Sequence, residues 1–234
     1  MKSIAVIIPA YNEEYSIKQV VKQLVELPMP DDYRVEIVVV NDCSSDNTKL
    51  ICEKLDCVLL NLPSNLGIGG AVQTGFIYAY NNDFDFAVQV DGDGQHPADQ
   101  LIKFIDKTKQ TDADVIIGSR YIEKEGFQSS LQRRLGIGLL NFWIKLLTGI
   151  RVTDCTSGYR MLNRKSLKIV RDLYPDDYPE PESIIIFHKN KLKIAEIPVV
   201  MKNREKGKSS IHFLSSIFYM IKVSLAIFFT YIKK

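Results

Sequence analysis

Phe86-Ala87-Val88-Gln89-Val90-Asp91-Gly92-Asp93 is a short apolar run that ends in two carboxylates separated by one glycine. The run predicts a buried strand, and Gly94 and Pro97 mark its end. Two carboxylates one residue apart at the end of a strand can reach the same point outside the sheet. That arrangement suits one hard divalent cation, Mg²⁺ or Mn²⁺, that already carries phosphate oxygens. Because an isolated Asp-Gly-Asp is usually a polar turn, the prediction depends on the rest of the chain.

Strand-like and helix-like segments alternate over the first 120 residues. This alternation is typical of an α/β fold in which helices cover both faces of a mostly parallel sheet. Strands are expected at residues 4–8, 35–40, 58–60, 84–90 and 115–117, with helices at residues 14–27, 46–55, 67–80 and 101–109. Further along, an amphipathic helix is expected at residues 131–147. Pro198 makes residues 193–201 an expected edge strand.

Polar clusters follow four of the expected strands, and each alone could be a loop or a helix cap. They are Pro9-Ala10-Tyr11-Asn12-Glu13, Asn41-Asp42-Cys43-Ser44-Ser45-Asp46, Asp91-Gly92-Asp93 and Gly118-Ser119-Arg120. In open α/β sheets, ligands bind at the carboxyl ends of the strands, near the point where the strand order reverses. The four clusters together therefore predict one shared ligand site.

Charge is unevenly distributed along the 234 residues, although the net charge is only +2. Residues 1–200 carry 23 Lys and Arg against 27 Asp and Glu, whereas residues 201–234 carry 7 against 1. A basic, apolar tail on a mildly acidic body favours an anionic membrane surface as a partner. The four cysteines form no CxxC pair, which argues against a zinc site and for reduced thiols. A strand-like segment begins at residue 4, so no signal peptide is expected and the body is placed in the cytoplasm.

The last segment, residues 211–232, consists of two apolar runs divided by Lys222. Spanning a bilayer takes roughly 20 apolar residues, so this length is barely sufficient. Two helices lying on the membrane fit the pattern equally well. A helix docked on the core is the remaining alternative. The basic residues before the segment favour the two membrane interpretations.

Taken together, the motifs resemble glycosyltransferase family 2, the inverting enzymes of GT-A type, and more narrowly the dolichyl-phosphate and polyprenyl-phosphate sugar synthases. The resemblance implies a GT-A, Rossmann-like transferase domain over residues 1–210 and a membrane-associating helical tail over residues 211–234. Asn41 and Cys43 depart from the family's usual Asp and Gly, and the tail is shorter than in relatives with several spans. The matching stretches beyond the strand-end clusters are Leu66-Gly67-Ile68-Gly69-Gly70-Ala71, Thr156-Ser157-Gly158-Tyr159-Arg160 and Arg204-Glu205-Lys206-Gly207-Lys208-Ser209.

The resemblance also implies roles for particular residues. The nucleotide-sugar donor is expected to contact Pro9, Tyr11, Glu13, Asp42, Gly67 and Asp91. The metal on its pyrophosphate is expected to contact Asp91, Asp93 and Gln95. An acceptor phosphate is expected to contact Arg120, Arg134, Arg204, Lys208 and Ser209, since guanidinium groups bind phosphate in a bidentate way.

The implied reaction moves a hexose from a UDP- or GDP-hexose to undecaprenyl or dolichyl phosphate at the cytoplasmic membrane face. A phosphate oxygen is already ionised at neutral pH, so such an acceptor needs little help from a general base. The alternative is a sugar hydroxyl acceptor in cell-wall or capsular polysaccharide synthesis, for which Asp154 or Glu182 could be the base. Both carboxylates are more simply interpreted as structural partners of Arg160 or a nearby lysine. A small membrane protein or a second copy of the chain is a further expected partner.

Other classes of protein fit less well. Gly67-Ile68-Gly69-Gly70 lacks the glycine at position 72 that a dinucleotide-binding motif requires. Gly207-Lys208-Ser209 lacks the glycine at position 202 of a phosphate-binding loop. No nucleic acid is expected, because the basic residues gather beside an apolar tail. A binding protein on a degenerate transferase fold remains open, but the intact Asp91-Gly92-Asp93 argues against it.

Overall fold

The computed structural model describes residues 1–128, 130–202 and 213–233, and over residues 213–219 only the backbone is described. The strands are β1 (Lys2–Ala10), β2 (Tyr33–Asn41), β3 (Val58–Asn61), β4 (Phe86–Gln89), β5 (Val115–Ser119), β6 (Arg160–Asn163) and β7 (Ile194–Pro198). The helices are α1 (Ile17–Val25), α2 (Thr48–Cys52), α3 (Gly67–Asn81), α4 (Gln100–Gln110), α5 (Leu131–Thr148), α6 (Arg164–Leu173), α7 (Pro179–Lys189) and α8 (Phe213–Ile232).

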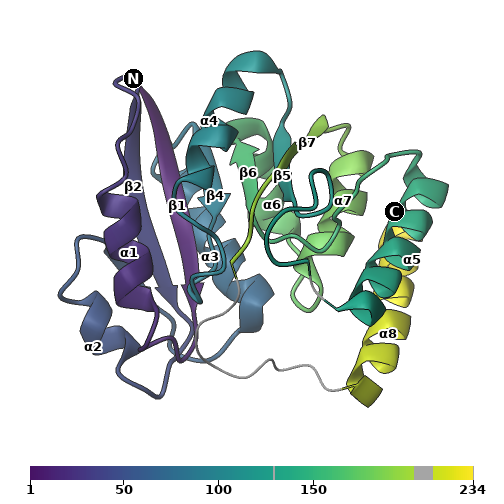
Figure 1. The fold of residues 1–234 in the computed structure, drawn as a ribbon, viewed down its shortest axis with the longest axis horizontal. Coiled ribbons are helices and arrows are strands. Elements are labelled where there is room, and N and C mark those ends of the chain that lie inside the picture. The colour runs from purple at the N-terminus through teal and green to yellow at the C-terminus, as the bar shows by residue number, and fades with distance from the viewer. Residues whose placement is uncertain (129, 203–212, 234) are drawn as a thin grey trace.

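Within these described ranges, seven strands form one sheet in the order β3-β2-β1-β4-β6-β5-β7 (Figure 1). β2 and β4 flank β1 on opposite sides and run parallel to it, so the strand order reverses at β1. β6 runs antiparallel to both β4 and β5. The expected α/β fold with a mostly parallel sheet is therefore confirmed, and its reversal point lies where the polar clusters were expected to meet.

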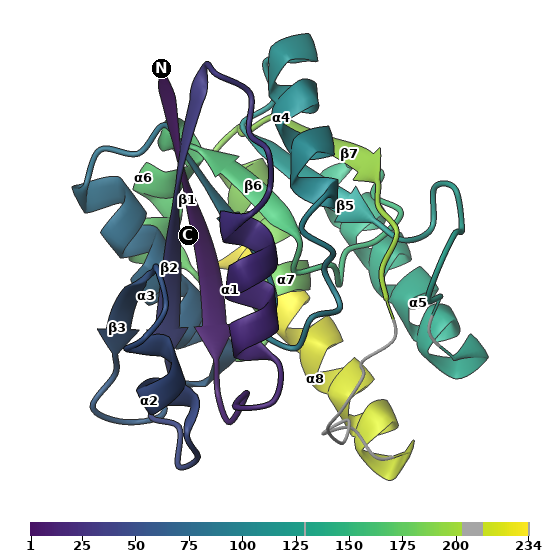
Figure 2. The same ribbon diagram turned by 60° about the vertical axis from the view of Figure 1, so that its left-hand side comes forward.

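Alternation along β1 explains why helices cover both faces of the sheet (Figure 2). Ile4, Val6 and Ile8 belong to one buried cluster, whereas Ala5 and Ile7 belong to another. Successive side chains of a strand point to opposite faces, and both sets are fully buried. A strand buried on both faces reads as the continuous apolar run that the sequence shows.

The second half of the chain matches the expectations in part. The amphipathic helix is α5, and the strand with Pro198 is β7, which lies at the edge of the sheet as predicted. Proline is tolerated there because an edge strand has a backbone side without a neighbour. β6 was not expected, because its four residues mix polar and apolar side chains.

The tail differs from the alternative of two helices divided at Lys222 and agrees with the alternative of a helix docked on the core. α8 continues through Lys222 as one helix and packs against α5 and α7. Val223 and Ile227 are buried in the same cluster as the domain core. In the part of the chain that the structure describes, no helix is long and apolar enough to cross a bilayer. The expected domain boundary between residues 210 and 211 lies outside the described residues and stays a prediction.

Candidate active site

The carboxyl ends of β1, β2 and β4 border a cavity of about 400 Å³. This volume is in the range of small-molecule sites. All the residues predicted to contact the donor line the cavity, and so does Asp93, whereas Gln95, Arg120 and Arg134 do not. The lining consists of Pro9, Ala10, Tyr11, Glu13, Asp42, Asn65, Gly67, Ile68, Ala71, Gln89, Asp91, Gly92, Asp93 and Glu180.

The loop after β1, which carries Tyr11 and Glu13, is tied to the loop after β2. Glu13 N–H donates to Thr48 Oγ1 at 2.8 Å. Asp46 accepts from the N–H of Thr48 at 2.9 Å and from the N–H of Glu14 at 3.1 Å. Partial burial opposes ionisation of Asp46, but these hydrogen bonds outweigh it and hold the pKa of the carboxyl below its ordinary value. An ionised Asp46 therefore holds the two loops in position at one side of the cavity.

Asp42 connects the end of β2 to the start of α3. It is 3% exposed, and one of its carboxylate oxygens accepts from Leu66 N–H at 2.7 Å. Asn65 Nδ2 donates to the Asp42 carbonyl at 3.2 Å. Gly67 follows with a φ of +74°, a left-handed conformation that glycine adopts at little cost. Asp42 thus lines the cavity and also orients the chain as it enters α3.

The turn that carries Asp91 and Asp93 is held by His96. Asp91 N–H donates to His96 Nδ1 at 3.0 Å, and His96 Nε2 lies 3.5 Å from Asp91 Oδ2. Because Nδ1 accepts, the neutral ring carries its proton on Nε2, on the side of that carboxylate. The buried His96 ring stacks on Tyr159, with ring centroids 4.6 Å apart. The sequence motif contained His96, but only the structure shows its contact with Asp91.

Gly158 lies directly against the turn of Asp91-Gly92-Asp93, which is called the metal turn below because a metal is predicted to bind there. A Cβ atom at this residue would be 2.6 Å from Gln89 Nε2 and 3.4 Å from Asp91 Oδ1. Gln89 Nε2 in turn donates to Asp91 Oδ1 at 3.2 Å. The glycine of the Thr156–Arg160 motif is therefore required for close approach, and no role for it was apparent from the sequence.

Arg160 joins β6 to α7 beneath the cavity lining. It is 2% exposed, and its guanidinium donates to the carbonyls of Ser157 and Cys155, both at 2.7 Å. Nη1 donates to Ser183 Oγ of α7 at 2.8 Å. A buried guanidinium satisfied by three acceptors fixes α7 relative to the sheet, and α7 brings Glu180 to the cavity.

Glu180 is a cavity residue that was not predicted from the sequence. Burial raises the pKa of this carboxyl above its ordinary value, and the charge of Arg160 opposes that rise. The rigid, acidic segment Tyr178-Pro179-Glu180-Pro181-Glu182 was the available signal, but the predicted candidate in it was Glu182. Glu182 instead accepts a hydrogen bond from Thr230 Oγ1 of α8, which supports a structural role for it with a different partner.

The side chains around the turn fit a divalent cation that arrives together with other ligands. Asp91 and Asp93 supply carboxylates to the same cavity, and the Asp91 side chain is 35% exposed. Among the described residues, no group of three His, Cys, Asp or Glu side chains is placed to hold a metal. Mg²⁺ is often bound by one or two carboxylates plus the phosphates of a substrate. The geometry fits that kind of shared coordination.

Comparison with known proteins agrees with this geometry. A sequence profile described as Glycosyl transferase family 2 matches residues 5–170. The chain belongs to glycosyltransferase family 2. It is 34% identical over 218 residues to the UDP-N-acetylglucosamine–dolichyl-phosphate N-acetylglucosaminyltransferase of Methanococcus voltae, covering 85% of each chain. It is 28% identical to the polyprenol monophosphomannose synthase of Mycolicibacterium smegmatis, covering 87% of this chain and 79% of that one.

Solved structures show that this family 2 transferase has the GT-A fold. Glucosyl-3-phosphoglycerate synthase from Mycobacterium tuberculosis, in complex with Mn²⁺, UDP and glucosyl-3-phosphoglycerate, matches with a TM-score of 0.69 at 19% identity. The match covers 98% of this chain and 80% of the synthase. A complex of TarS from S. aureus with UDP-GlcNAc matches with a TM-score of 0.67 at 18% identity, covering 98% of this chain and 67% of the TarS chain.

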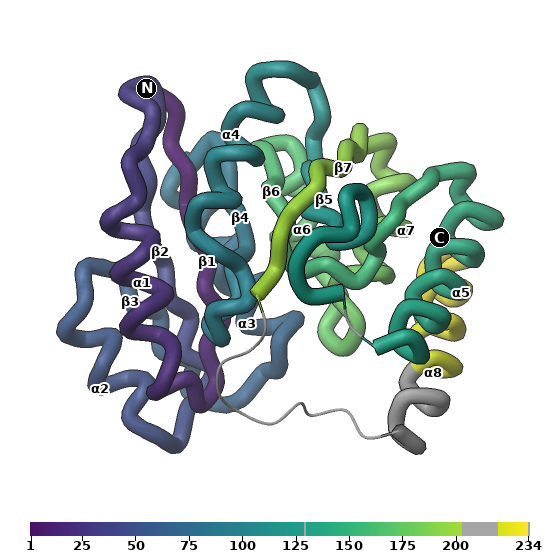
Figure 3. Tube along the Cα trace, in the orientation of Figure 1, coloured from purple at the N-terminus to yellow at the C-terminus, as the bar shows by residue number. Residues whose placement is uncertain are grey.

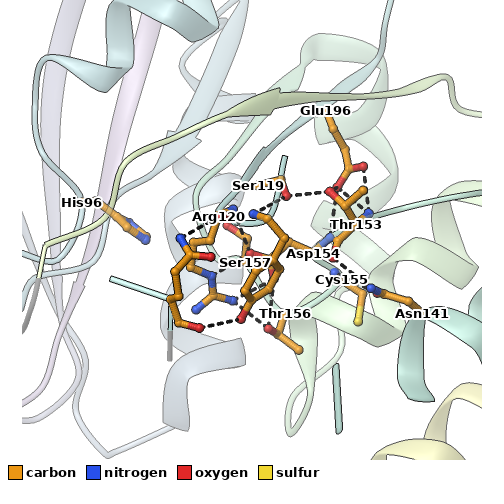
Figure 4. Close-up of polar contacts among 12 residues, drawn as sticks. His96, Ser119, Arg120, Asn141, Thr153, Asp154, Cys155, Thr156, Ser157 and Glu196 are labelled. Carbon is orange, nitrogen blue, oxygen red and sulfur yellow. Dashed lines mark hydrogen bonds and ion pairs between the residues drawn. The ribbon is translucent and has the colours of Figure 1, made fainter. Parts of the chain in front are cut away.

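Within this transferase, Arg120 forms a buried ion pair (Figure 4). Its Nε and Nη2 donate to the two carboxylate oxygens of Asp154 at 2.6 and 2.7 Å, and Nη2 also donates to Thr156 Oγ1 at 2.8 Å. Arg120 is 6% exposed and Asp154 is fully buried. The structural interpretation of Asp154 is supported, with Arg120 rather than Arg160 as its partner. Nε and Nη2 of Arg120 are thus engaged inside the protein, and its contact with an acceptor phosphate stays a prediction.

The other predicted acceptor residues lie elsewhere. Arg134 is exposed in the first turn of α5, away from the cavity lining. Arg204, Lys208 and Ser209 fall outside the described residues, so their roles stay predictions. The chain that leads to them passes the metal turn, since Lys202 N–H donates to the Gln95 carbonyl at 3.0 Å and Gln95 Nε2 donates to the Lys202 carbonyl at 3.3 Å (Figure 3).

Proposed function

We propose that this family 2 transferase moves a hexose from a UDP- or GDP-hexose to a polyprenyl phosphate, undecaprenyl or dolichyl phosphate, with inversion at the anomeric carbon. The proposal of a nucleotide-sugar donor rests on one observation: Asp42, Asp91 and Asp93 line one cavity at the carboxyl ends of β2 and β4. The acceptor half rests on similarity to relatives named for dolichyl-phosphate and polyprenol-phosphate products.

In the donor half, Tyr11 offers an aromatic face to the base, and Glu13 and Asp42 offer carboxylates to ribose hydroxyls or base N–H groups. Asp91 and Asp93, with Gln95 as the predicted third ligand, would hold Mg²⁺ or Mn²⁺ against the diphosphate. When bound, the metal neutralises the charge that builds on the leaving diphosphate.

In the acceptor half, an oxygen of the lipid phosphate attacks the anomeric carbon of the hexose. The bond between that carbon and the diphosphate oxygen breaks, and its electron pair leaves with the nucleoside diphosphate. The candidates to bind the acceptor phosphate are Arg120, Arg134, Arg204, Lys208 and Ser209. The reaction is placed at the cytoplasmic membrane face, and a small membrane protein or a second copy of the chain is the proposed partner.

A sugar hydroxyl is the second candidate acceptor, and one observation favours it. A hydroxyl needs a general base, and Glu180 places a carboxyl with a raised pKa in the cavity. Glu180→Gln separates the two acceptors because the shape of the side chain is kept. Transfer to a lipid phosphate is expected to change less than about fivefold, whereas transfer to a hydroxyl is expected to fall at least about a hundredfold.

The direct test is mass spectrometry of the lipid extract after incubation with undecaprenyl phosphate, Mg²⁺ or Mn²⁺ and individual UDP- and GDP-sugars. The proposal predicts a new polyprenyl-phosphate hexose that disappears with EDTA and in Asp93→Asn. Asp106→Asn, an exposed carboxylate on α4, is the matched control and is expected to keep full activity. If Asp93→Asn kept normal turnover, the metal role would be wrong. If every donor left the lipid unchanged while nucleotide still bound, the acceptor would be wrong.

A further inference from the structure

The loop between α5 and β6 connects Arg120 to the metal turn. Residues 153–158, called the 153–158 loop below, contact the candidate site at both ends. Near the first end, the two carboxylate oxygens of Asp154 accept from Arg120 at 2.6 and 2.7 Å. At the other end, Gly158 packs against Gln89 and Asp91. A displacement of this loop would therefore be felt on two sides of the site.

Arg120 acts on the cavity through its charge, although it does not line the cavity. Burial raises the pKa of Glu180, and the charges of Arg160 and Arg120 oppose that rise. Burial also opposes the charge of Arg120, but its hydrogen bonds to Asp154 raise the pKa of the guanidinium, and the charge of Asp91 adds to that rise. Glu180 and Asp91 both line the cavity, so the guanidinium lies within electrostatic range of it.

The contacts of Arg120 leave one of its nitrogens for a ligand. Nε and Nη2 donate to Asp154, and Nη2 also donates to Thr156 Oγ1 at 2.8 Å. Nη1 has no hydrogen-bond partner among the residues that the structure describes. Because a guanidinium is planar, the two bonds to Asp154 fix the direction in which Nη1 donates. The position of Asp154 therefore sets the aim of this donor.

Two side chains that do not line the cavity hold the 153–158 loop (Figure 4). Glu196 of β7 accepts from Thr153 N–H at 2.8 Å and from Asp154 N–H at 3.1 Å. Asn141 of α5 donates to the Thr153 carbonyl at 2.9 Å and accepts from Cys155 N–H at 3.2 Å. Backbone polar groups that are withdrawn from water need partners, and here two side chains supply them at three successive residues. Glu196 and Asn141 are called the loop clamp below.

The two ends of the 153–158 loop have separate supports. Within the described part of the chain, every hydrogen bond of the Glu196 carboxylate goes to Thr153 or Asp154. Arg160 holds the other end through the carbonyl of Ser157, at 2.7 Å. Loss of the loop clamp is therefore expected to displace the end that binds the guanidinium and to leave the end beside the metal turn in place.

We infer that Glu196 and Asn141 are positioning residues of the candidate active site, which act through Asp154 to aim the guanidinium of Arg120. The groups that contact a ligand must be held by supporting hydrogen bonds, and these two side chains supply them from β7 and α5. The inference deepens the proposed function and rests on it in one respect, because Arg120 is a predicted contact of the acceptor phosphate. From the sequence, neither clamp residue was a candidate for the site.

Arginine side-chain NMR of the full chain measures the aim of the guanidinium without turnover. The Nε–H signal of Arg120 is assigned by through-bond correlation to its own backbone, so no variant of Arg120 is required. We expect the exchange rate of this proton with water to rise at least about tenfold in Glu196→Ala and in Asn141→Ala, since each change removes hydrogen bonds that hold its acceptor. Glu196→Gln keeps one oxygen for the same donors and is expected to restore most of the protection.

Kinetics separate positioning from a general loss of stability. In Glu196→Ala and Asn141→Ala, the KM for undecaprenyl phosphate is expected to rise at least about tenfold, whereas the Mn²⁺-dependent affinity for UDP or GDP stays within about twofold. Leu24→Ala, which removes buried atoms from the cluster on the other face of the sheet, is the control for lost stability. Asn190→Ala, an exposed asparagine at the end of α7, is the matched control for Asn141→Ala. Both controls are expected to leave the exchange rate at Arg120 and the KM unchanged.

Three outcomes would overturn the inference. One is wild-type exchange at Arg120 in whichever of the two clamp variants folds. Another is an equal increase in exchange in Leu24→Ala, which would make it an effect of stability. The third is a loss of nucleotide affinity as large as the rise in KM, which would mean that the clamp supports the whole site. A chain that shows the expected exchange but forms no lipid product would refute the proposed acceptor and leave the loop clamp intact.

Discussion

Replacing Gly158 with alanine tests whether the segment beside Asp91 holds the metal turn in place. The new Cβ would lie 2.6 Å from Gln89 Nε2, which is well inside van der Waals distance, so Gln89 has to move. Gln89 is 1% exposed, and it donates to Asp91 Oδ1 at 3.2 Å. The movement therefore breaks a hydrogen bond to Asp91 and leaves a buried donor without its acceptor.

The magnitude follows from these two effects. An unsatisfied buried donor costs about 1–3 kcal/mol, and an extra methyl group in a packed interior costs about 1–3 kcal/mol. We expect Gly158→Ala to lower the free energy of unfolding by about 2–6 kcal/mol, measured by urea denaturation. We also expect the Mn²⁺-dependent affinity for UDP or GDP, measured by calorimetry, to fall at least about tenfold, which corresponds to about 1.4 kcal/mol.

Two control variants make the result interpretable. Gly138→Ala places its Cβ where no atom lies within 4 Å, in the interior of α5. The same change there is expected to raise stability by about 0.5–1 kcal/mol. Gln89→Ala creates room for the new methyl group, so Gly158→Ala is expected to cost less in that background than in the wild type. A Gly158→Ala protein with unchanged Mn²⁺-dependent nucleotide affinity would refute the inference that close packing at Gly158 holds Asp91 in its metal-binding position.

Three further predictions concern buried polar groups. His96→Ala removes the acceptor of Asp91 N–H and a stacked ring, so urea denaturation is expected to show a loss of about 2–4 kcal/mol; a loss below about 1 kcal/mol would contradict the contact. Asp154→Asn leaves Arg120 as an uncompensated buried charge and is expected to cost about 3–5 kcal/mol, whereas Asp154→Leu combined with Arg120→Met is expected to cost less. The pKa of Glu180 is higher in the folded state than in the unfolded state. When no metal is bound, the protein is therefore expected to lose stability as the pH rises above about 4.3, the pKa of this carboxyl in the unfolded chain. Glu180→Gln is therefore expected to be more stable than wild type at neutral pH, and parallel stability curves from pH 4 to 8 would argue against the raised pKa.

Sequence pattern was sufficient for the architecture of the first half of the chain. The alternation of β1 between two buried clusters, and the apolar run before Asp91, are local properties that a sequence displays directly. The carboxyl ends of neighbouring parallel strands lie at one edge, so the clusters around Pro9, Asp42 and Asp91 could be assigned to one site from their positions in the chain. The four-residue β6 had no such signal, because its pairing with β4 and β5 depends on where the sheet places it.

Only the tertiary structure shows which residues pair with the buried charges. Asp154 could have paired with any nearby basic residue, and it pairs with Arg120, which is 34 positions away. Glu180 reaches the cavity on α7, which Arg160 ties to the sheet through Ser183 and which also packs its apolar residues into the core. Composition identifies which residues are charged, but it contains no information about which charges are brought together.

The sequence by itself determined the fold class, the sheet edge that carries the cavity and the position of Asp91 and Asp93 at the end of a buried strand, because these follow from periodicity and from the geometry of parallel strands. Only the tertiary structure decided that Gly158 and His96 hold the turn of Asp91 and Asp93. It also decided that Arg120 forms an ion pair with the buried Asp154 and that α8 packs beside α5. These facts depend on contacts between segments far apart in the chain, and such contacts are set by how the whole chain packs.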